Sequence, residues 1–209
     1  MNPFYKLTHL FLRVIFRFLF NLKITGSKNI PRKGGVLILS NHSSNLDPPI
    51  IAVSLFREVY FLAKAELFKF KLLKDIFSSL NAFPIKRNAV DRQALANCFQ
   101  ILKIQKVLLL FPEGTRSKDG KLQQGQVGAG MIIAKAKKEF GAIIIPAYIK
   151  DSFKMLPWGK YIIKPGQVQV RFGPSIEYSE EILSNLNKES YQKIINITME
   201  KINNLGKIE

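Results

Sequence analysis

The sequence predicts an α/β fold in which a mostly parallel, mixed sheet is flanked by helices. Three observations support this prediction. Short, wholly apolar segments recur along the chain, segments with apolar residues at helical spacing separate them, and polar clusters directly follow two of the apolar segments. Apolar segments of this kind are typical of parallel strands that are buried on both faces. With 209 residues, of which 47% are hydrophobic, the chain is long enough for one domain with a sizeable core.

The N-terminal segment, residues 1–24, differs from the rest. Asn2-Pro3 is a helix start, and residues 4–20 are strongly apolar. Polar residues interrupt this stretch within about 80° of the helix circumference; they are Lys6, His9, Arg13 and Arg17. No apolar run approaches the ~20 residues of a spanning helix, and no signal-peptide cleavage site is recognisable. We therefore expect residues 1–24 to be an amphipathic, membrane-associating segment and residues 25–209 to be the α/β domain. The alternative is a core helix whose basic stripe faces water.

The remaining elements are expected to alternate between strands and helices. The predicted strands are 24–30 with a turn at Gly26, then 35–39, 59–62, 82–85, 107–111, 142–146 and 168–172, the last at an edge or half-buried. The predicted helices are 50–56, 64–80, 90–104, 128–138 and 179–205. The helix over 64–80 is either an ordinary amphipathic helix or a second basic-apolar surface. Cys98 lies on the apolar side of its helix, which favours a packed structural thiol.

The charge balance indicates an anionic partner. The chain has 32 Lys and Arg residues against 15 Asp and Glu residues, a formal net charge of +17. A membrane surface, a nucleic acid or a phosphorylated substrate would each suit this excess. A basic nucleic-acid-binding module is the less favoured alternative, because the aromatic residues gather in apolar helical segments and do not alternate with Lys and Arg along strands. A single cysteine excludes an intramolecular disulfide, and two distant histidines do not supply a typical zinc site.

Residues 40–47 form the first polar cluster, between a predicted buried strand and Pro48-Pro49 at a helix start. In open α/β sheets, ligands bind at loops that follow the carboxyl ends of strands. The imidazole of His42 can take a proton from a hydroxyl near neutral pH, and the carboxylate of Asp47 can fix its tautomer. The simpler interpretation is that Asp47 only caps the helix and His42 is an ordinary loop residue.

Residues 112–117, with Glu113 and Arg116, form the second polar cluster, directly after the predicted strand 107–111. The carboxyl ends of parallel strands meet at one edge of a sheet, so this loop is expected to approach His42 and Asp47. Arg116 would then add a guanidinium to this edge of the sheet.

Four motifs occur in a fixed order: Asn41-His42-x4-Asp47, Phe-Pro-Ile-Lys-Arg at 83–87, Phe-Pro-Glu-Gly-Thr-Arg-Ser at 111–117, and Ile-Ile-Pro-Ala at 144–147. Over roughly residues 25–150 the chain resembles the glycerolipid acyltransferase family, and most closely its bacterial 1-acylglycerol-3-phosphate acyltransferases. The resemblance implies that an acyl group moves from a thioester, on coenzyme A or acyl carrier protein, to a lysophospholipid hydroxyl. Phosphatidic acid for phospholipid biosynthesis is the implied product, and no metal or cofactor beyond the acyl thioester is implied.

The resemblance also implies roles for single residues. His42 would be the general base and Asp47 its orienting partner, while Arg87 matches the arginine of the second motif. The residues that match the motif for the phosphorylated glycerol are Glu113, Gly114, Thr115 and Arg116. In this mechanism His42 removes the hydroxyl proton during attack on the thioester carbonyl, and thiolate leaves from a tetrahedral intermediate. An anionic membrane surface is the expected partner, with the protein monotopic on the cytoplasmic face of the cell membrane.

Three positions depart from the family pattern. Lys86 stands where an acidic residue is frequent, which leaves the charge of the acceptor site open, and Asn81 and Gln105 stand where glycine is frequent in turns. Glycerol-3-phosphate or another lyso-lipid is the alternative acceptor. A serine hydrolase is disfavoured because no Gly-x-Ser-x-Gly elbow is present.

Overall fold

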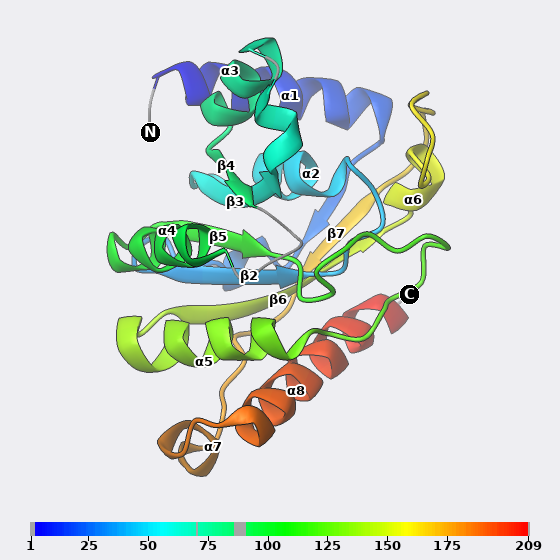
Figure 1. Ribbon diagram of the computed structural model, residues 1–209. Coiled ribbons are helices and arrows are strands. Elements are labelled where there is room, and N and C mark those ends of the chain that lie inside the picture. Colours follow the sequence, from blue (N-terminus) through cyan, green and yellow to red (C-terminus); the bar gives the residue numbers. More distant parts are fainter. Residues whose placement is uncertain (1–2, 70, 86–90, 209) are drawn as a thin grey trace.

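The protein folds into a seven-stranded sheet between two layers of helices (Figure 1). The structure, a computed structural model, describes residues 3–69, 71–85 and 91–208. The strand order is β1-β7-β6-β2-β5-β3-β4, and every neighbouring pair is parallel except β6 and β7. This confirms the predicted α/β class with a mostly parallel, mixed sheet.

The strands are β1 (Lys23–Thr25), β2 (Val36–Ser40), β3 (Val59–Lys64), β4 (Ala82–Ile85), β5 (Val107–Leu110), β6 (Ile143–Lys150) and β7 (Gln169–Phe172). The α-helices are α1 (Pro3–Leu19), α2 (Asp47–Val53), α3 (Lys71–Ser79), α4 (Arg92–Lys103), α5 (Val127–Phe140), α6 (Ser152–Met155), α7 (Glu180–Ser184) and α8 (Lys188–Lys207). Two 3-10 helices, η1 (Ser27–Asn29) and η2 (Ala65–Lys69), complete the described elements.

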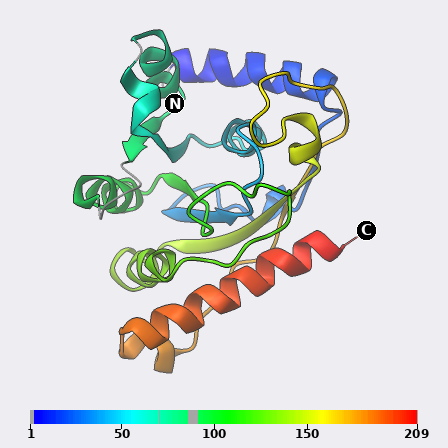
Figure 2. The ribbon, with the colours of Figure 1, turned by 45° about the vertical axis from the view of Figure 1, so that its right-hand side comes forward.

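The central strand β2 is buried on both faces, as its continuous apolar sequence predicts. Because successive side chains alternate across a strand, Val36 and Ile38 enter the core under α1 and α2, whereas Leu37 and Leu39 enter the core with α4, α5 and α8. Burial of one such side chain stabilises the fold by about 1.5–3 kcal/mol. In Figure 2, α1 lies above α2 on the first face.

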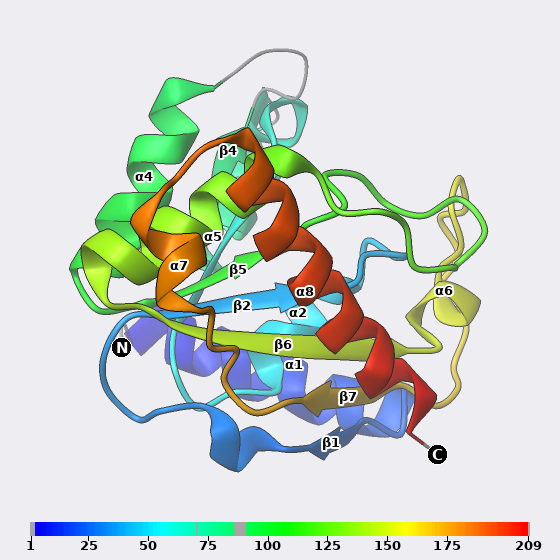
Figure 3. The same cartoon turned by 90° about the horizontal axis from the view of Figure 1, so that it is seen from below.

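The second layer is held by a close contact between α5 and α8, which cross the other face of the sheet (Figure 3). A Cβ at Gly130 would lie 2.2 Å from the carbonyl oxygen of Tyr191, so only glycine permits this approach. In place of one helix over 179–205 the structure has α7 and α8. The break comes at Asn187, whose side chain accepts hydrogen bonds from the amides of Glu189 and Ser190 and so starts a new helix.

Two further expectations are corrected by the sheet and its connections. The segment 64–80 is not one helix, because η2 ends at Lys69 and α3 begins at Lys71. The strand β7 is not at the edge of the sheet, because β1 pairs with it in parallel and occupies the edge, and it is not half-buried, because three of its four residues are buried. The three residues of β1 carry too little apolar alternation for the sequence to show this pairing.

Helix α1 packs one side against the domain and exposes the other. Tyr5 and Phe16 are buried, and the Nε2–H group of His9 lies 2.8 Å from the carbonyl oxygen of Leu55 and 3.1 Å from that of Ala52, at the end of α2. His9 is therefore not part of an exposed basic stripe; it satisfies backbone carbonyls that a helix end leaves unpaired. The opposite side exposes Leu7, Leu10, Phe11, Val14 and Phe18. None of the helices in the described part of the chain has the length and apolar character needed to cross a membrane.

Candidate active site

The His42–Asp47 pair lies where β2 ends and α2 begins. Asp47 Oδ2 is 2.9 Å from His42 Nδ1, and it also accepts hydrogen bonds of 2.7 Å from the amides of Ser43 and Ser44. The Asp47 side chain is fully buried, so the loop folds around this carboxylate. Since a carboxylate only accepts, the His42 Nδ1 carries the proton, and Nε2 is the acceptor when the ring is neutral.

Asp47 does not cap α2 in the way the sequence suggested. It is the first residue of the helix; its Oδ2 binds only His42, Ser43 and Ser44, and its Oδ1 has no hydrogen-bond partner among the described residues. The two residues that follow are Pro48 and Pro49, which have no N–H groups for a cap to accept from. The Asp47 carboxylate therefore does not cap α2. It binds the preceding loop and the imidazole of His42.

The backbone of His42 is held on both sides by the loop that follows β5. Its amide donates to Glu113 Oε1 at 2.7 Å, and its carbonyl oxygen accepts from the amide of Ser117 at 2.8 Å. The ring stacks on Phe111, with centroids 3.9 Å apart and planes at 14°. The two loops meet because β2 and β5 are parallel neighbours, with Leu39 opposite Leu110 at their carboxyl ends.

Glu113 points into the protein, away from a position where it could contact a phosphate directly. Its side chain is 2% exposed, and its second carboxylate oxygen accepts from the amide of Gln123 at 3.1 Å. Burial raises the pKa of Glu113 from 4.5 to about 7, against the lowering effect of the amides of His42 and Gln123. The Glu113 carboxylate thus connects the loop between β2 and α2, which carries His42, to the loop that follows β5.

Arg116 lies on the outer side of the same loop, where Gly114 and Thr115 are exposed. Arg116 is half-buried, and its guanidinium stacks over the ring of Trp158, 4.4 Å from the ring centroid. Ser117 binds His42, so Arg116 is one residue from the contact that joins the two loops. The sequence reasoning did not include Trp158; the available indication was the sole tryptophan, next to Pro157 and Gly159.

The His42 loop is also bonded to the segment around α6. The side chain of Asn41 donates to the carbonyl oxygen of Ile149 at 2.9 Å and accepts from its amide at 2.7 Å. Ser44 Oγ donates to the carbonyl oxygen of Leu156 at 3.0 Å. The hydroxyls of Ser43 and Ser152 lie 3.1 Å apart. The sequence reasoning missed these contacts because they join residues more than a hundred positions apart.

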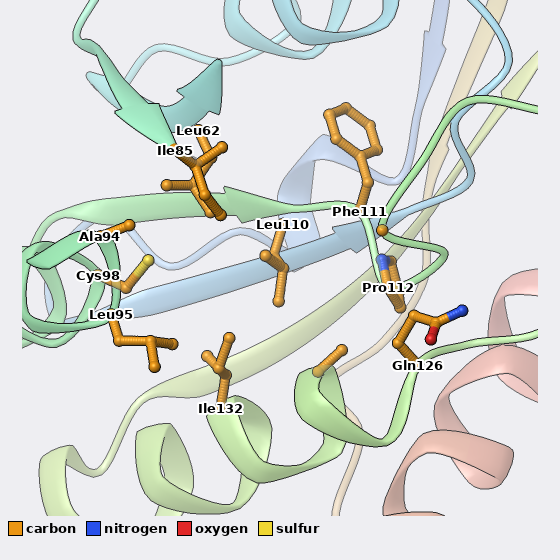
Figure 4. A pocket seen from close by; sticks show the side chains of 12 residues that line it. Leu62, Ile85, Ala94, Leu95, Cys98, Leu110, Phe111, Pro112, Gln126 and Ile132 are labelled. Carbon is orange, nitrogen blue, oxygen red and sulfur yellow. The ribbon is translucent and has the colours of Figure 1, made fainter. Parts of the chain in front are cut away.

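An apolar cavity of about 140 Å³ opens beside the second loop, between α4, β5 and α5 (Figure 4). Phe111, Pro112 and Gly114 line it at the loop, and Cys98 and Ile132 line it further in. Burial raises the pKa of Cys98 to about 12, so this thiol does not supply a thiolate nucleophile. The prediction of a packed structural thiol is confirmed.

Arg87 and Lys86 of the second motif lie outside the described residues, whereas residues 83–85 of this motif belong to β4. The first and third motifs are brought together at the carboxyl edge of the sheet. They present a buried carboxylate on His42 Nδ1, an Nε2 that can accept a proton, and the guanidinium of Arg116 on the adjoining loop. In chemical terms, this arrangement can take a proton from a hydroxyl and offers a guanidinium for an anionic group.

The chain belongs to the Acyltransferase family, whose model matches residues 21–150. It is similar to the chloroplast 1-acyl-sn-glycerol-3-phosphate acyltransferase of Arabidopsis thaliana, with 30% identity over 171 residues that cover 79% of this chain and 47% of that protein. The chain thus spans about half the length of this chloroplast relative. A 1-acyl-sn-glycerol-3-phosphate acyltransferase of Bacillus subtilis is 26% identical over 178 residues, which cover 84% of each chain.

Among solved structures, the chain is similar to PlsC, the 1-acyl-sn-glycerophosphate acyltransferase from Thermotoga maritima. The TM-score is 0.75 at 25% identity, and the match covers 98% of this chain and 80% of that one. The similarity therefore extends beyond residues 21–150 to α1 and to the C-terminal helices.

Proposed function

We propose that this protein is a 1-acylglycerol-3-phosphate O-acyltransferase, which moves an acyl group from a thioester to the free hydroxyl of a lysophosphatidic acid. The observation that carries the proposal is the His42–Asp47 pair, held by Glu113 and Ser117 of the loop that presents Arg116. The names of the similar proteins from Arabidopsis thaliana, Bacillus subtilis and Thermotoga maritima support the same reaction.

In the proposed mechanism, His42 Nε2 accepts the proton of the acceptor hydroxyl while its oxygen attacks the thioester carbonyl. The Asp47 carboxylate, 2.9 Å from Nδ1, stabilises the imidazolium that forms. The tetrahedral intermediate then expels the thiolate, and His42 returns its proton to that sulfur. General-base catalysis of this kind is typically worth ~10²–10⁴-fold. No metal or cofactor other than the acyl thioester is needed for these steps.

The two substrates are proposed to bind on different sides of the loop that follows β5. Arg116 is proposed to bind the phosphate of the acceptor through paired donors, with Gly114 and Thr115 beside it and Arg87 as a second cation. The apolar cavity lined by Phe111 and Ile132 is proposed to receive part of an acyl chain. Glu113 is proposed to act on the acceptor indirectly, by positioning the loop. Coenzyme A or acyl carrier protein would deliver the acyl group, and the excess of positive charge suits either.

The protein is proposed to bind an anionic membrane surface as a monotopic protein, on the cytoplasmic face of the cell membrane. The support is α1, which exposes large apolar side chains on the side opposite the domain. Arg17 is exposed on the same helix, and Arg13 stacks over Phe56, 4.5 Å from its ring centroid. An apolar face edged by cations is typical of a helix that lies in the membrane interface.

The test is an assay with purified protein, anionic vesicles, acyl-coenzyme A and lysophosphatidic acid, in which thiol release and phosphatidic acid are measured together. His42→Ala is the paired variant. Release that requires both the acceptor and His42 supports the proposal, whereas release without an acceptor indicates a thioesterase. Acyl carrier protein as donor, and glycerol-3-phosphate or another lyso-lipid as acceptor, complete the series. Failure of every donor–acceptor pair would overturn the proposal.

A further inference from the structure

The loop 157–166, between α6 and β7, exposes large apolar side chains at its tip. Tyr161 is 93% exposed, Ile162 is 79% exposed and Ile163 is 45% exposed. Trp158, at the start of the loop, is 37% exposed and carries the guanidinium of Arg116 on its ring. An exposed cluster of this kind is uncommon on a soluble surface and marks a place of contact with a membrane or another molecule.

The base of the loop is fixed to the fold. The amide of Lys164 donates to the carbonyl oxygen of Met155 at 2.9 Å, and the amide of Gly166 donates to that of Leu19 at 3.1 Å. A Cβ at Gly166 would lie 2.5 Å from the end of the Met155 side chain, so the loop packs closely against α6 here. The apolar tip is therefore held out from a firm base.

The loop continues the exposed apolar side of α1. Its hydrogen bond to Leu19 places it at the C-terminal end of that helix, and Figures 1 and 2 both show the two side by side there. Phe18, the neighbour of Leu19, is 85% exposed. The tip of the loop and the apolar side of α1 can therefore meet one surface.

The charges around the tip favour an anionic lipid surface over a protein partner. Lys160 and Lys164 flank the three apolar residues, the segment 157–166 contains no acidic residue, and Lys118 lies 5.9 Å from the centroid of the Trp158 ring. Lysines around an aromatic and aliphatic tip suit a bilayer, because the apolar side chains enter the acyl region while the ammonium groups remain at the phosphates.

We propose that the loop 157–166 is a second membrane-inserting element, which acts beside α1 and sets Arg116 at the depth of the lipid phosphates. Tyr161, Ile162 and Ile163 enter the bilayer, and Trp158 lies at its interface, where tryptophan is enriched in membrane proteins. The stack with Trp158 then fixes Arg116 against the phosphate of an acceptor that is still in the lipid layer. This inference deepens the proposed function, on which it rests for the identity of the acceptor.

The sole tryptophan of the chain makes the first test direct, because all tryptophan fluorescence comes from Trp158. Vesicles of phosphatidylglycerol and phosphatidylcholine, without any substrate, are expected to shift its emission to shorter wavelengths. Vesicles whose lipids are brominated along the acyl chains are expected to quench it. Unshifted and unquenched emission from protein that sediments with the vesicles would overturn the proposal, since α1 would then bind alone. A change with acyl carrier protein but not with vesicles would also overturn it.

The second test separates insertion from catalysis. Ile162→Glu is expected to lose the quenching and about tenfold of the transfer rate on vesicles, because an apolar side chain no longer enters the bilayer. Its rate with a short-chain lysophosphatidic acid, kept below its micelle concentration, is expected to equal that of the unmodified protein. Ile104→Glu is the matched control, because Ile104 is also an exposed isoleucine. It follows α4 and precedes β5, so it lies at the amino ends of the parallel strands, away from the loop 157–166.

The outcomes of the two proposals are distinguishable. If the unmodified protein shows quenching but no acyl transfer, the proposed function would be wrong. The proposal that the loop 157–166 inserts into the membrane would still stand. If Ile162→Glu and Ile104→Glu catalyse acyl transfer on vesicles equally well, the proposed function would stand. The proposal that the loop 157–166 inserts into the membrane would then be wrong.

Discussion

The segments 40–47 and 157–166 depart from ordinary burial in opposite directions. In the first, Asn41, His42, Ser43, Ser44 and Asp47 are all buried although they are polar. In the second, the tip residues are apolar and all exposed. Buried polar groups are tolerated in the first segment because nearly every one finds a hydrogen-bond partner. Exposed apolar side chains have no such compensation within the described fold, which is why we propose that the second segment meets a lipid surface.

The two segments are also joined, which gives the contrast a functional meaning. Ser44 Oγ binds the carbonyl oxygen of Leu156, next to the start of the loop, and Arg116 connects the third motif to Trp158. The hydrogen-bonded segment thus lies where the proposed mechanism transfers a proton, and the exposed apolar segment lies where we propose contact with lipid. The predictions below test this division, starting with the largest expected effect.

Removal of the base should affect activity without affecting the fold. His42→Ala is expected to lower acyl transfer by at least ~10²–10⁴-fold, the usual worth of a general base. The variant is expected to remain folded in urea denaturation, because the backbone contacts of His42 to Glu113 and Ser117 remain although the stack on Phe111 and the hydrogen bond to Asp47 are lost. Near-normal turnover would show that the buried segment is not the catalytic one.

Removal of the carboxylate should affect both properties. Asp47→Ala is expected to lower acyl transfer by a similar factor, because the tautomer of His42 is no longer held. It is also expected to lower the free energy of unfolding by about 1–3 kcal/mol, because the amides of Ser43 and Ser44 lose their buried acceptor. A variant that loses activity but retains full stability would contradict the view that the loop folds around Asp47.

Membrane binding should be sensitive to the exposed side of α1 and insensitive to the buried segment. Phe11→Glu is expected to weaken sedimentation with anionic vesicles by about tenfold or more, because a large apolar contact with the bilayer is lost. His42→Ala and Ile104→Glu are the controls and are expected to bind as the unmodified protein does. Equal binding by all three variants would show that α1 does not contribute to membrane binding.

The pH dependence of stability should report the burial of Glu113. Its pKa of about 7 in the folded protein lies above the ordinary 4.5, so between these values the folded protein retains a proton that the unfolded chain has released. The free energy of unfolding therefore falls as the pH rises through this window, by up to about 1.4 kcal/mol per unit. Glu113→Gln is expected to lack this contribution in urea denaturation at pH 5 and pH 7. Parallel pH profiles for the two proteins would contradict it.

The smallest change in stability is expected at two turns that lie outside both segments. Gln105 has φ +58° and Asn81 has φ +60°, in the left-handed region that glycine adopts without strain. Gln105→Gly is expected to raise the free energy of unfolding by about 1 kcal/mol, and Asn81→Gly by less, because asparagine tolerates this region better. Thermal or urea denaturation measures both, and a destabilised Gln105→Gly would show that its side chain contributes packing that outweighs the strain.

The sequence alone determined the sheet and the proximity of two motifs. Apolar segments such as 35–39, 107–111 and 142–146 are typical of parallel strands that are buried on both faces. Parallel neighbours place the loops that follow them at one edge, so the approach of Glu113 to His42 followed from local pattern and one rule of topology. The positive φ of Asn81 and Gln105 was also indicated, since both stand where the family frequently has glycine.

Only the tertiary structure decided which groups complete the site and which surfaces remain open. The burial of His9, the inward direction of Glu113 and the stack of Arg116 on Trp158 depend on segments that are far apart in sequence. Sequence periodicity reports how one segment divides its own faces, but it does not report which partner covers each face. The exposed tip of the loop 157–166 and its place beside α1 could be seen only in the assembled fold, because burial depends on how separate segments pack together.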